Sequence, residues 1–264
     1  MDRLQCQWCG VQNPSGRTSC VTCGAALDVA DLVSDSGWQE APRLRDMTSI
    51  QFSNSSCQVE GELVPVAEMT LAAGDAVFFE HQIMLWKDES VPVSTMPTDG
   101  GMKRALAGMP FLVTMAHGPG RVAFSRDASG EVVVLPLHPS MELDVREHAF
   151  LVATHSIAYS FVRLKGYKNV MHGGGMYMDR FVTAGEPGLL LLHGFGNVFQ
   201  RTLGPGEKIL VEPGGFLYKD SSVTMDVKQL DVKTGLMSKG MYLAEMTGPG
   251  RVGIQSMYHH HHSE

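Results

Sequence analysis

The sequence predicts an all-β protein in which three tandem β-sandwich units form one body behind a small four-cysteine zinc ribbon. Three observations lead to this prediction. Beyond Met47 the chain consists of short runs rich in Val, Leu, Phe and Thr, many bounded by Gly, Pro, Asn or Asp, and it lacks long segments with a helical period. The same region repeats itself every 66 residues, and a pair of Cys-x2-Cys motifs precedes it.

The first element is a ribbon predicted over residues 1–27, which contains Cys6, Cys9, Cys20 and Cys23. A two-residue gap lets both thiolates of a pair point at one ion, so two pairs complete a tetrahedral shell for Zn2+. Such a shell has no open position, and we therefore predict one structural zinc per chain. The segment is too short to bury much surface, so the metal must supply most of its stability.

Two alternatives for these cysteines are a disulfide pair in a secreted domain and a set of unrelated buried thiols. The chain starts without the basic and then apolar layout of a secretory signal, which disfavours the first alternative. The regular spacing disfavours the second. The segment is similar to the small zinc ribbon found at the ends of many bacterial proteins.

The next segment, residues 28–46, is predicted to be an acidic linker. It is irregular, and its acidic residues outnumber its basic ones. The charged residues are Asp28, Asp31, Asp35, Glu40 and Asp46 against Arg43 and Arg45. Such a composition is typical of a tether. At the other end of the chain, residues 258–264 form a histidine-containing tail that plays no part in the predicted function.

The repeat defines the large β domain, predicted over residues 47–257. Leu71, Leu137 and Leu203 are 66 residues apart, and six of the sixteen columns that start there are apolar in all three copies. Random placement would give roughly one or two such columns. The columns are Leu71/Leu137/Leu203, Val77/Leu143/Ile209, Phe79/Val145/Val211, Met84/Phe150/Phe216, Leu85/Leu151/Leu217 and Trp86/Val152/Tyr218.

Each copy also ends in a Pro-Gly turn, at residues 119–120, 187–188 and 249–250. Proline fixes φ and glycine permits positive φ, so each pair marks a turn that leads into a strand. The first and last turns belong to the phrase Gly-Pro-Gly-Arg-Val. We therefore predict three units, over about 47–122, 123–189 and 190–257. One unit alone buries little surface, so the three are expected to pack side by side.

Residues 47–257 resemble the family of altered inheritance of mitochondria protein 24, also called mitochondrial biogenesis proteins. The residues that carry the resemblance are the two Gly-Pro-Gly-Arg-Val phrases, the Leu-x-Pro turns at 137–139 and 203–205, and the glycine-rich segment 168–176. The resemblance implies three units that are each like the tryptophan RNA-binding attenuation protein (TRAP-like), and a homotrimer that closes a ring of nine similar units. It implies no catalytic residues.

Composition and motifs narrow the function. The chain has 28 acidic and 21 basic residues, for a net charge of -7, which disfavours a polyanion such as nucleic acid as the main partner. It contains no apolar run long enough for a transmembrane helix, and we expect a cytoplasmic protein. The segment His172–Gly175 resembles an oxyanion-hole element, but no Gly-x-Ser-x-Gly motif accompanies it, and nucleotide-binding glycine motifs are missing. The other histidines are scattered, and Cys57 is expected to pack in the core.

The sequence thus predicts a non-catalytic scaffold: a trimeric β ring that binds an unknown protein partner, with zinc ribbons as contact modules. Two alternatives stay open. The ribbon and the likeness to an RNA-binding ring leave a nucleic-acid-binding module. A pocket at the junctions between units leaves a small-ligand carrier or an enzyme.

Overall fold

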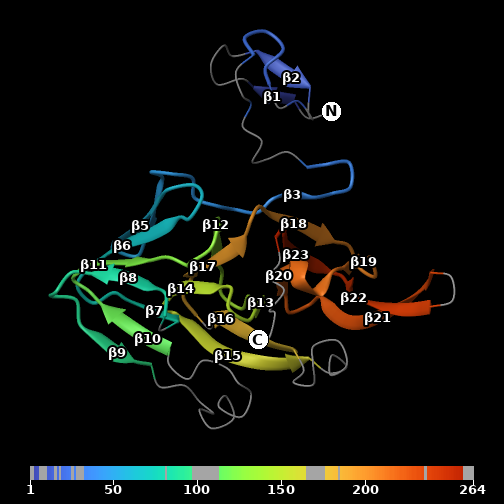
Figure 1. The fold of residues 1–264 in the computed structure, drawn as a ribbon. Helices are drawn as coiled ribbons and strands as arrows, with labels where there is room; N and C mark the ends of the chain where they lie inside the picture. The colour runs from blue at the N-terminus through green and yellow to red at the C-terminus, as the bar shows by residue number, and fades with distance from the viewer. Residues whose placement is uncertain are drawn as a thin grey trace.

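The computed structural model describes residues 3–5, 11–14, 17, 19–24, 27, 33–80, 82–96, 113–164, 176–183, 185–234 and 237–257. Within these ranges the regular elements are β-strands and one short 3-10 turn, η2 (Pro213–Gly215), and every strand pairing is antiparallel. The prediction of an all-β fold is confirmed (Figure 1). No helix in the described ranges is long and apolar enough to cross a membrane.

The strands form five sheets, and the two largest contain six and seven strands. The six-stranded sheet contains, in order, β12 (Gly130–Leu137), β17 (Gly188–Phe195), β14 (Phe150–Thr154), β7 (Ala76–Glu80), β10 (Val113–His117) and β9 (Val93–Thr95). The seven-stranded sheet contains β15 (Ile157–Leu164), β16 (Met176–Thr183), β13 (Glu142–Arg146), β20 (Phe216–Asp220), β23 (Gly250–Gln255), β18 (Val198–Leu203) and β3 (Gln39–Glu40).

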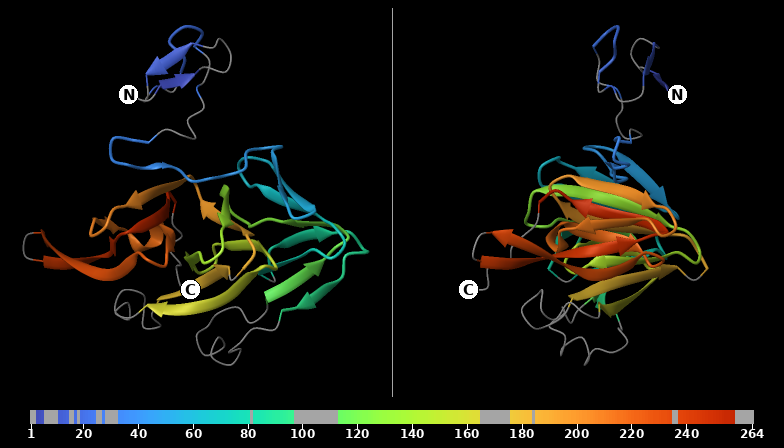
Figure 2. Two further views of the ribbon diagram at one scale, coloured as in Figure 1. Left: turned by 180° about the vertical axis from the view of Figure 1, so that it is seen from behind. Right: turned by 90° about the vertical axis from the view of Figure 1, so that its right-hand side faces the viewer.

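The remaining sheets are smaller. The five-stranded sheet contains β4 (Ser49–Phe52), β5 (Ser55–Glu60), β6 (Val66–Leu71), β11 (Gly120–Phe124) and β8 (Met84–Lys87). The three-stranded sheet contains β19 (Lys208–Val211), β22 (Met237–Thr247) and β21 (Thr224–Thr234), and the two-stranded sheet contains β1 (Arg3–Gln5) and β2 (Gln12–Pro14). The hairpin of β21 and β22 projects from the rest of the molecule (Figure 2).

The strand pairings recur with the 66-residue period of the sequence. Phe79 of β7 lies opposite Val152 of β14, and 66 residues later Val145 of β13 lies opposite Tyr218 of β20. Each of the two largest sheets is therefore a composite, with β9, β10 and β7 joined to β14, β17 and β12, and with β15, β16 and β13 joined to β20, β23 and β18. Backbone hydrogen bonds thus cross from each repeat to the next.

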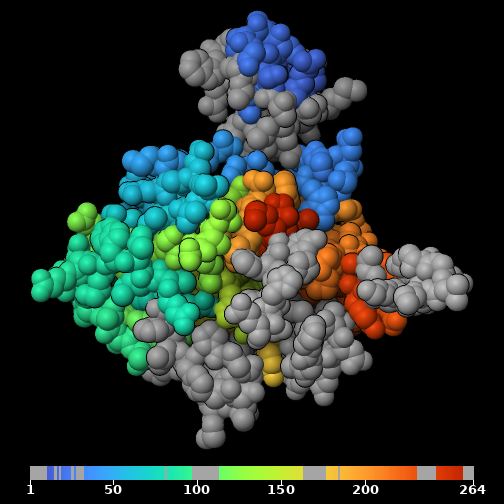
Figure 3. All heavy atoms as spheres, in the orientation of Figure 1, coloured from blue at the N-terminus to red at the C-terminus, as the bar shows by residue number. Residues whose placement is uncertain are grey.

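The predicted unit boundaries fall inside strands and not between them. The boundary at 122/123 falls inside β11 and that at 189/190 falls inside β17. The cyan and green residues of the first repeat lie toward one end of the molecule, and orange residues of the last repeat lie toward the other (Figure 3). β8 lies toward the end formed by the first repeat and β19 toward the end formed by the last (Figure 1).

The turns that close the first and third repeats have the same construction. The carboxylate of Asp88 accepts a hydrogen bond from the backbone N–H of Arg121 at 2.9 Å, and that of Asp220 accepts one from the N–H of Arg251 at 2.7 Å. The glycine before each arginine has a φ of 138°, a conformation that favours glycine. The Gly-Pro-Gly-Arg-Val phrase is therefore a structural motif.

The central core cluster lies between the two composite sheets, and two further clusters pack the five-stranded and three-stranded sheets against them. Its centre is an aromatic cluster in which the rings of Phe150 and Phe181 are 4.8 Å apart and those of Phe78 and Phe150 are 5.4 Å apart. Phe78 belongs to the first repeat, whereas the other two belong to the second. Aromatic burial therefore reinforces the hydrogen bonds that join the repeats.

The prediction of a free acidic tether over residues 28–46 is wrong for its second part. β3 extends the seven-stranded sheet by pairing with β18, and Ala41 is buried in the core. Arg43 bridges to Val133 of β12 and forms an ion pair with Glu131. The edge of β18 offers free backbone groups to this segment, and a basic side chain meets a buried carboxylate. Residues 28–32 lie outside the described residues.

Candidate functional site

We consider two candidate sites among the described residues, and the first is the turn that holds Cys20 and Cys23. The backbone N–H of Thr22 donates to Sγ of Cys20 at 3.5 Å, and the N–H of Gly24 donates to the carbonyl of Cys20 at 3.0 Å. Gly24 has a φ of 71°, which favours glycine. The Cys20 side chain is buried, whereas Cys23 is exposed. An N–H directed at sulfur stabilises the thiolate, which is the form that binds metal.

Asn13 holds this turn in place. Its side chain is fully buried; Nδ2 donates to Sγ of Cys20 at 3.6 Å and to the carbonyl of Val11 at 3.0 Å, while Oδ1 accepts from the N–H of Val21 at 2.8 Å. The asparagine therefore links β2 to the cysteine turn and adds a second donor toward the sulfur. Sequence spacing alone did not assign this role to Asn13.

The described half of the ribbon fits a zinc thiolate pair. Two cysteines stand in one tight turn, with backbone and amide donors directed at the buried sulfur. The other predicted ligands, Cys6 and Cys9, lie outside the described residues, between β1 and β2. No group of three or more metal-binding side chains occurs among the described residues, which contain only two of the four cysteines. The four-cysteine zinc site therefore stays a prediction.

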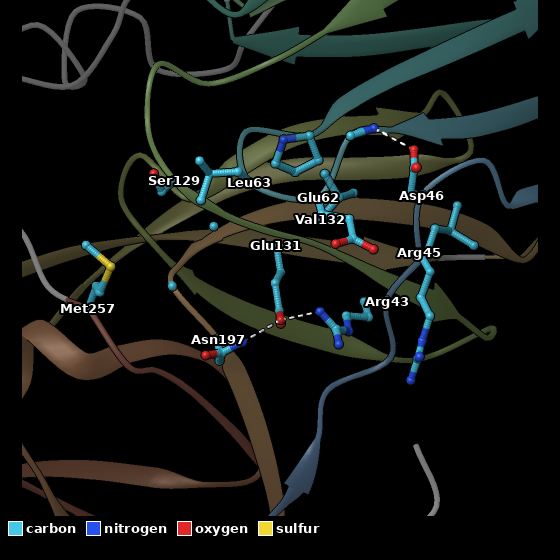
Figure 4. Close-up of a pocket in the computed structure, with 15 residues that line it drawn as sticks. Arg43, Arg45, Asp46, Glu62, Leu63, Ser129, Glu131, Val132, Asn197 and Met257 are labelled. Carbon is cyan, nitrogen blue, oxygen red and sulfur yellow. Dashed lines mark hydrogen bonds and ion pairs between the residues drawn. The ribbon is translucent and has the colours of Figure 1, made fainter. Parts of the chain in front are cut away.

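The second site is a cavity of about 470 Å³ with both polar and apolar lining residues (Figure 4). Its lining comes from residues 43–46, which follow β3 and are called the docked segment below. The other lining residues come from the turn between β5 and β6, the start of β12 and the turn after β17. The residues that line it are Arg43, Leu44, Arg45, Asp46, Gly61, Glu62, Leu63, Pro65, Ser129, Gly130, Glu131, Val132, Gly196, Asn197 and Met257. The cavity thus lies where all three predicted repeats meet the docked segment.

Glu131 organises this cavity. Its carboxylate accepts hydrogen bonds from Arg43, from Nδ2 of Asn197 at 2.9 Å and from the backbone N–H of Val198 at 3.0 Å. The side chains of Arg43 and Asn197 point toward it (Figure 4). Glu131 is nearly buried, and Arg43 also pairs with Glu40 at 3.5 Å. Sequence reasoning missed this cluster because its members are far apart along the chain.

Two other groups considered from the sequence, Cys57 and His193, lie in the interior. Cys57 is buried, and burial raises the pKa of its thiol to about 12, which suits core packing. His193 is also buried, and its Nε2 lies 3.1 Å from the carbonyl of Ala128. Burial, with a smaller contribution from the charge of Arg126, lowers the pKa of His193 to about 4. The segment His172–Gly175 and the histidine tail lie outside the described residues.

Known proteins resemble the β body. A crystal structure of protein SPYM3_0169 from Streptococcus pyogenes superposes with a TM-score of 0.59 and 20% sequence identity; the match covers 77% of this chain and 94% of that one. At this identity the likeness concerns the fold alone. No curated protein sequence matches the chain. The profile of the family described as mitochondrial biogenesis AIM24 matches residues 57–257, which is most of the chain. The chain therefore belongs to the mitochondrial biogenesis AIM24 family.

Proposed function

We propose that the chain is a cytoplasmic, non-catalytic binding platform. Three copies form a ring of TRAP-like units, and each copy presents one zinc ribbon as a contact module for a protein partner. Family membership relates the chain to mitochondrial biogenesis proteins. A ring with several ribbons raises their effective concentration near a target that has several binding sites.

The observation that carries the proposal is the construction of the sheets. Each internal sheet joins strands of two neighbouring repeats, whereas the five-stranded and three-stranded sheets at the two ends hold strands of one repeat only. A row of repeats that ends in two half-sheets is suited to self-association, because unpaired sheet edges offer backbone donors and acceptors. The repeated hydrogen bonds between repeats make a rigid support.

The ribbon supports the second part of the proposal. Cys20 and Cys23 with Asn13 would hold one half of a zinc shell, and Cys6 and Cys9 would hold the other. The metal would supply folding free energy to a segment that has only a small apolar cluster of its own. The ion would shape a contact surface and take no part in a reaction.

Two measurements on the full-length chain test this function. Light scattering after size exclusion should give the mass of a trimer, and a monomer at micromolar concentration would exclude the ring. Affinity capture should then compare the wild-type chain with the double variant Cys20→Ser/Cys23→Ser. We expect the variant to lose its partner while it keeps its oligomeric mass. The variant Cys57→Ser is the matched control, since Cys57 lies in the core of the β body.

A small-ligand carrier is a second candidate, and the cavity around Glu131 favours it. Its volume of about 470 Å³ is in the range of small-molecule sites, and it lies at the meeting point of the repeats. A thermal-shift screen of metabolites would favour this function if one compound stabilised the wild-type chain strongly and Asn197→Ala abolished the effect. The absence of any stabilising compound would leave the platform as the better proposal.

A further inference from the structure

The first and last repeats each expose a strand whose counterparts elsewhere in the chain are buried. By the 66-residue period, β8 corresponds to β14 and β20, and β19 corresponds to β7 and β13. The strands β14 and β7 are buried throughout, and β20 and β13 are buried except at their ends. In contrast, Leu85 and Trp86 of β8 are 59% and 37% exposed, and Leu210 of β19 is 44% exposed.

Each exposed strand also lies at the edge of its sheet. The side that it leaves open is the side on which its counterparts pair with a strand of the neighbouring repeat. Within the part of the chain that the structure describes, β8 pairs only with β11, whereas β14 pairs with β17 and β7, and β20 pairs with β23 and β13. Likewise, of the described strands only β22 pairs with β19, whereas β7 pairs with β10 and β14. Among the described residues, both outer edges offer an unpaired row of backbone groups.

The backbone of β8 already has the shape of its paired counterparts. A register shift interrupts the pairing of β14 with β17 between Phe150 and Val152, and that of β20 with β23 between Phe216 and Tyr218. In β8 the corresponding residues are Met84 and Trp86, and the pairing with β11 also shifts there, from Phe124 to Ala123. Bulges set the twist and position of a strand, so β8 is preformed for a partner like β7 or β13.

We infer that β19 of one copy pairs antiparallel with β8 of a second copy in a defined register. The two internal joints place Phe79 opposite Val152 and Val145 opposite Tyr218. The same offset places Val211 opposite Trp86 of the second copy and Leu210 opposite Lys87 of the second copy. The three-stranded and five-stranded end sheets then become one composite sheet. This inference rests on the self-association in the proposed function and specifies its interface.

A further backbone hydrogen bond supports this register. At the first internal joint the N–H of His155 donates to the carbonyl of Ala76 at 3.1 Å, and at the second the N–H of Ser221 donates to that of Glu142 at 3.0 Å. The residue pairs differ by the same 66 positions. The inferred joint would therefore contain a hydrogen bond from the N–H of Glu89 of the second copy to the carbonyl of Lys208.

The side chains also suit a second copy as the occupant. At the internal joints, the columns equivalent to Leu210 and Lys87 hold Phe78 opposite Ala153 and Asp144 opposite Lys219. Leu210 would lie against the aliphatic stem of Lys87 of the second copy, and the lysine head would reach solvent. Both halves of the joint are present on one chain, at opposite ends. The contact is therefore head-to-tail, which closes a ring when the rotation between neighbouring copies is a whole fraction of a turn.

Paired cysteines test the register. In the full-length chain, Leu210→Cys combined with Lys87→Cys is expected to give disulfide-linked oligomers under mild oxidation, because opposite residues in antiparallel strands lie within bonding range. The control combines Leu210→Cys with Val93→Cys, which is also exposed but lies in β9. It is expected to give no linked species, and single variants show the background from the native cysteines. Equal linkage in both pairs would overturn the register.

Charge variants test the same contact without oxidation. Leu210→Asp recreates the pair formed by Asp144 and Lys219, so the oligomer should persist; Leu210→Lys opposes two ammonium groups and should raise the dissociation constant about tenfold or more at low salt. Lys87→Asp should rescue Leu210→Lys. If the wild-type oligomer forms but Leu210→Lys leaves it unchanged and no linkage occurs, this interface is wrong and the platform stands. A monomeric wild type would refute both.

Discussion

The ammonium nitrogen of Lys219 lies 2.7 Å from Oδ2 of Asp144, in register across β13 and β20, and the two side chains are only 5% and 2% exposed. Arg180 of β16 donates to the other carboxylate oxygen at 2.7 Å from the opposite side. The joint between the second and third repeats therefore contains a buried ionic cluster. At the first joint the corresponding residues are Phe78 and Ala153, so the same backbone pairing accepts either chemistry.

The ionic cluster predicts a non-additive mutational effect. Asp144→Leu leaves the Lys219 ammonium buried without a carboxylate and should lower the free energy of unfolding by about 3–5 kcal/mol. The double variant Asp144→Leu/Lys219→Met should recover much of that loss, because no uncompensated charge remains buried. Urea unfolding of both single variants and the double variant measures the coupling. Additive losses would show that the two residues do not act as a pair.

Because His193 is buried, we predict that the folded chain loses stability in mild acid. Its pKa lies at about 4 in the folded chain and near 6.5 when unfolded, so below pH 6.5 the unfolded state binds the proton more strongly. The contribution of the neutral ring is complete above pH 6.5 and is lost as pH falls toward 4, by up to about 3 kcal/mol. Urea unfolding at pH 7 and pH 4.5 should show a smaller difference for His193→Gln than for the wild type. The same difference in both chains would contradict the prediction.

We predict that removing the Asn13 side chain weakens the predicted zinc site. Asn13→Ala deletes the donor to Sγ of Cys20 and the link to Val21, and it should weaken zinc binding about 10- to 100-fold, as is usual for groups that orient metal ligands. Competition with a chromophoric chelator measures the affinity, and Co2+ absorption reports the thiolate geometry. Gln12→Ala, on the exposed face of β2, is the control. Equal affinity in both variants would remove the orienting role.

We predict that neutralising Glu131 releases the docked segment from the sheet that contains β12. Glu131→Gln removes the charge that pairs with Arg43 and weakens the bonds to Asn197 and Val198, which should cost about 1–3 kcal/mol. Trypsin should then cut more rapidly after Arg43 and Arg45. Glu62→Gln, on the exposed turn that lines the same cavity, is expected to leave the cutting rate unchanged. Slow cutting of both variants would show that β3 alone holds the segment.

Local patterns in the sequence predicted a large part of this architecture. Runs of Val, Leu and Phe bounded by turn residues have a local cause, which is the alternation of strands and turns, and they led to the all-β class. The period from Leu71 to Leu137 and Leu203 corresponds to pairings that recur at the same offset. The spacing of Cys20 and Cys23 corresponds to a turn with donors directed at sulfur.

Features that depend on contacts between distant residues could not be predicted. Arg43 and Glu131 are 88 residues apart, and neither residue alone indicates that the segment after β3 docks on the β body. Its acidic neighbours indicated a tether, but a free strand edge and a single buried carboxylate override composition. The exchange of strands between repeats was also invisible, since a repeat in sequence fixes equivalent positions but not which copy supplies the neighbouring strand.

The composite sheets have a consequence for how the chain folds. β7 cannot complete its sheet until β14 is available, and β12 and β14 need β17, which ends more than a hundred residues after β7. Pairings this distant in sequence are slow to form, and they leave apolar strands uncovered in the nascent chain. The β body should therefore unfold as one cooperative block. A ribosome-bound chain that ends before residue 195 lacks part of β17 and should therefore bind chaperones. A longer chain that exposes all of β17 should bind them less.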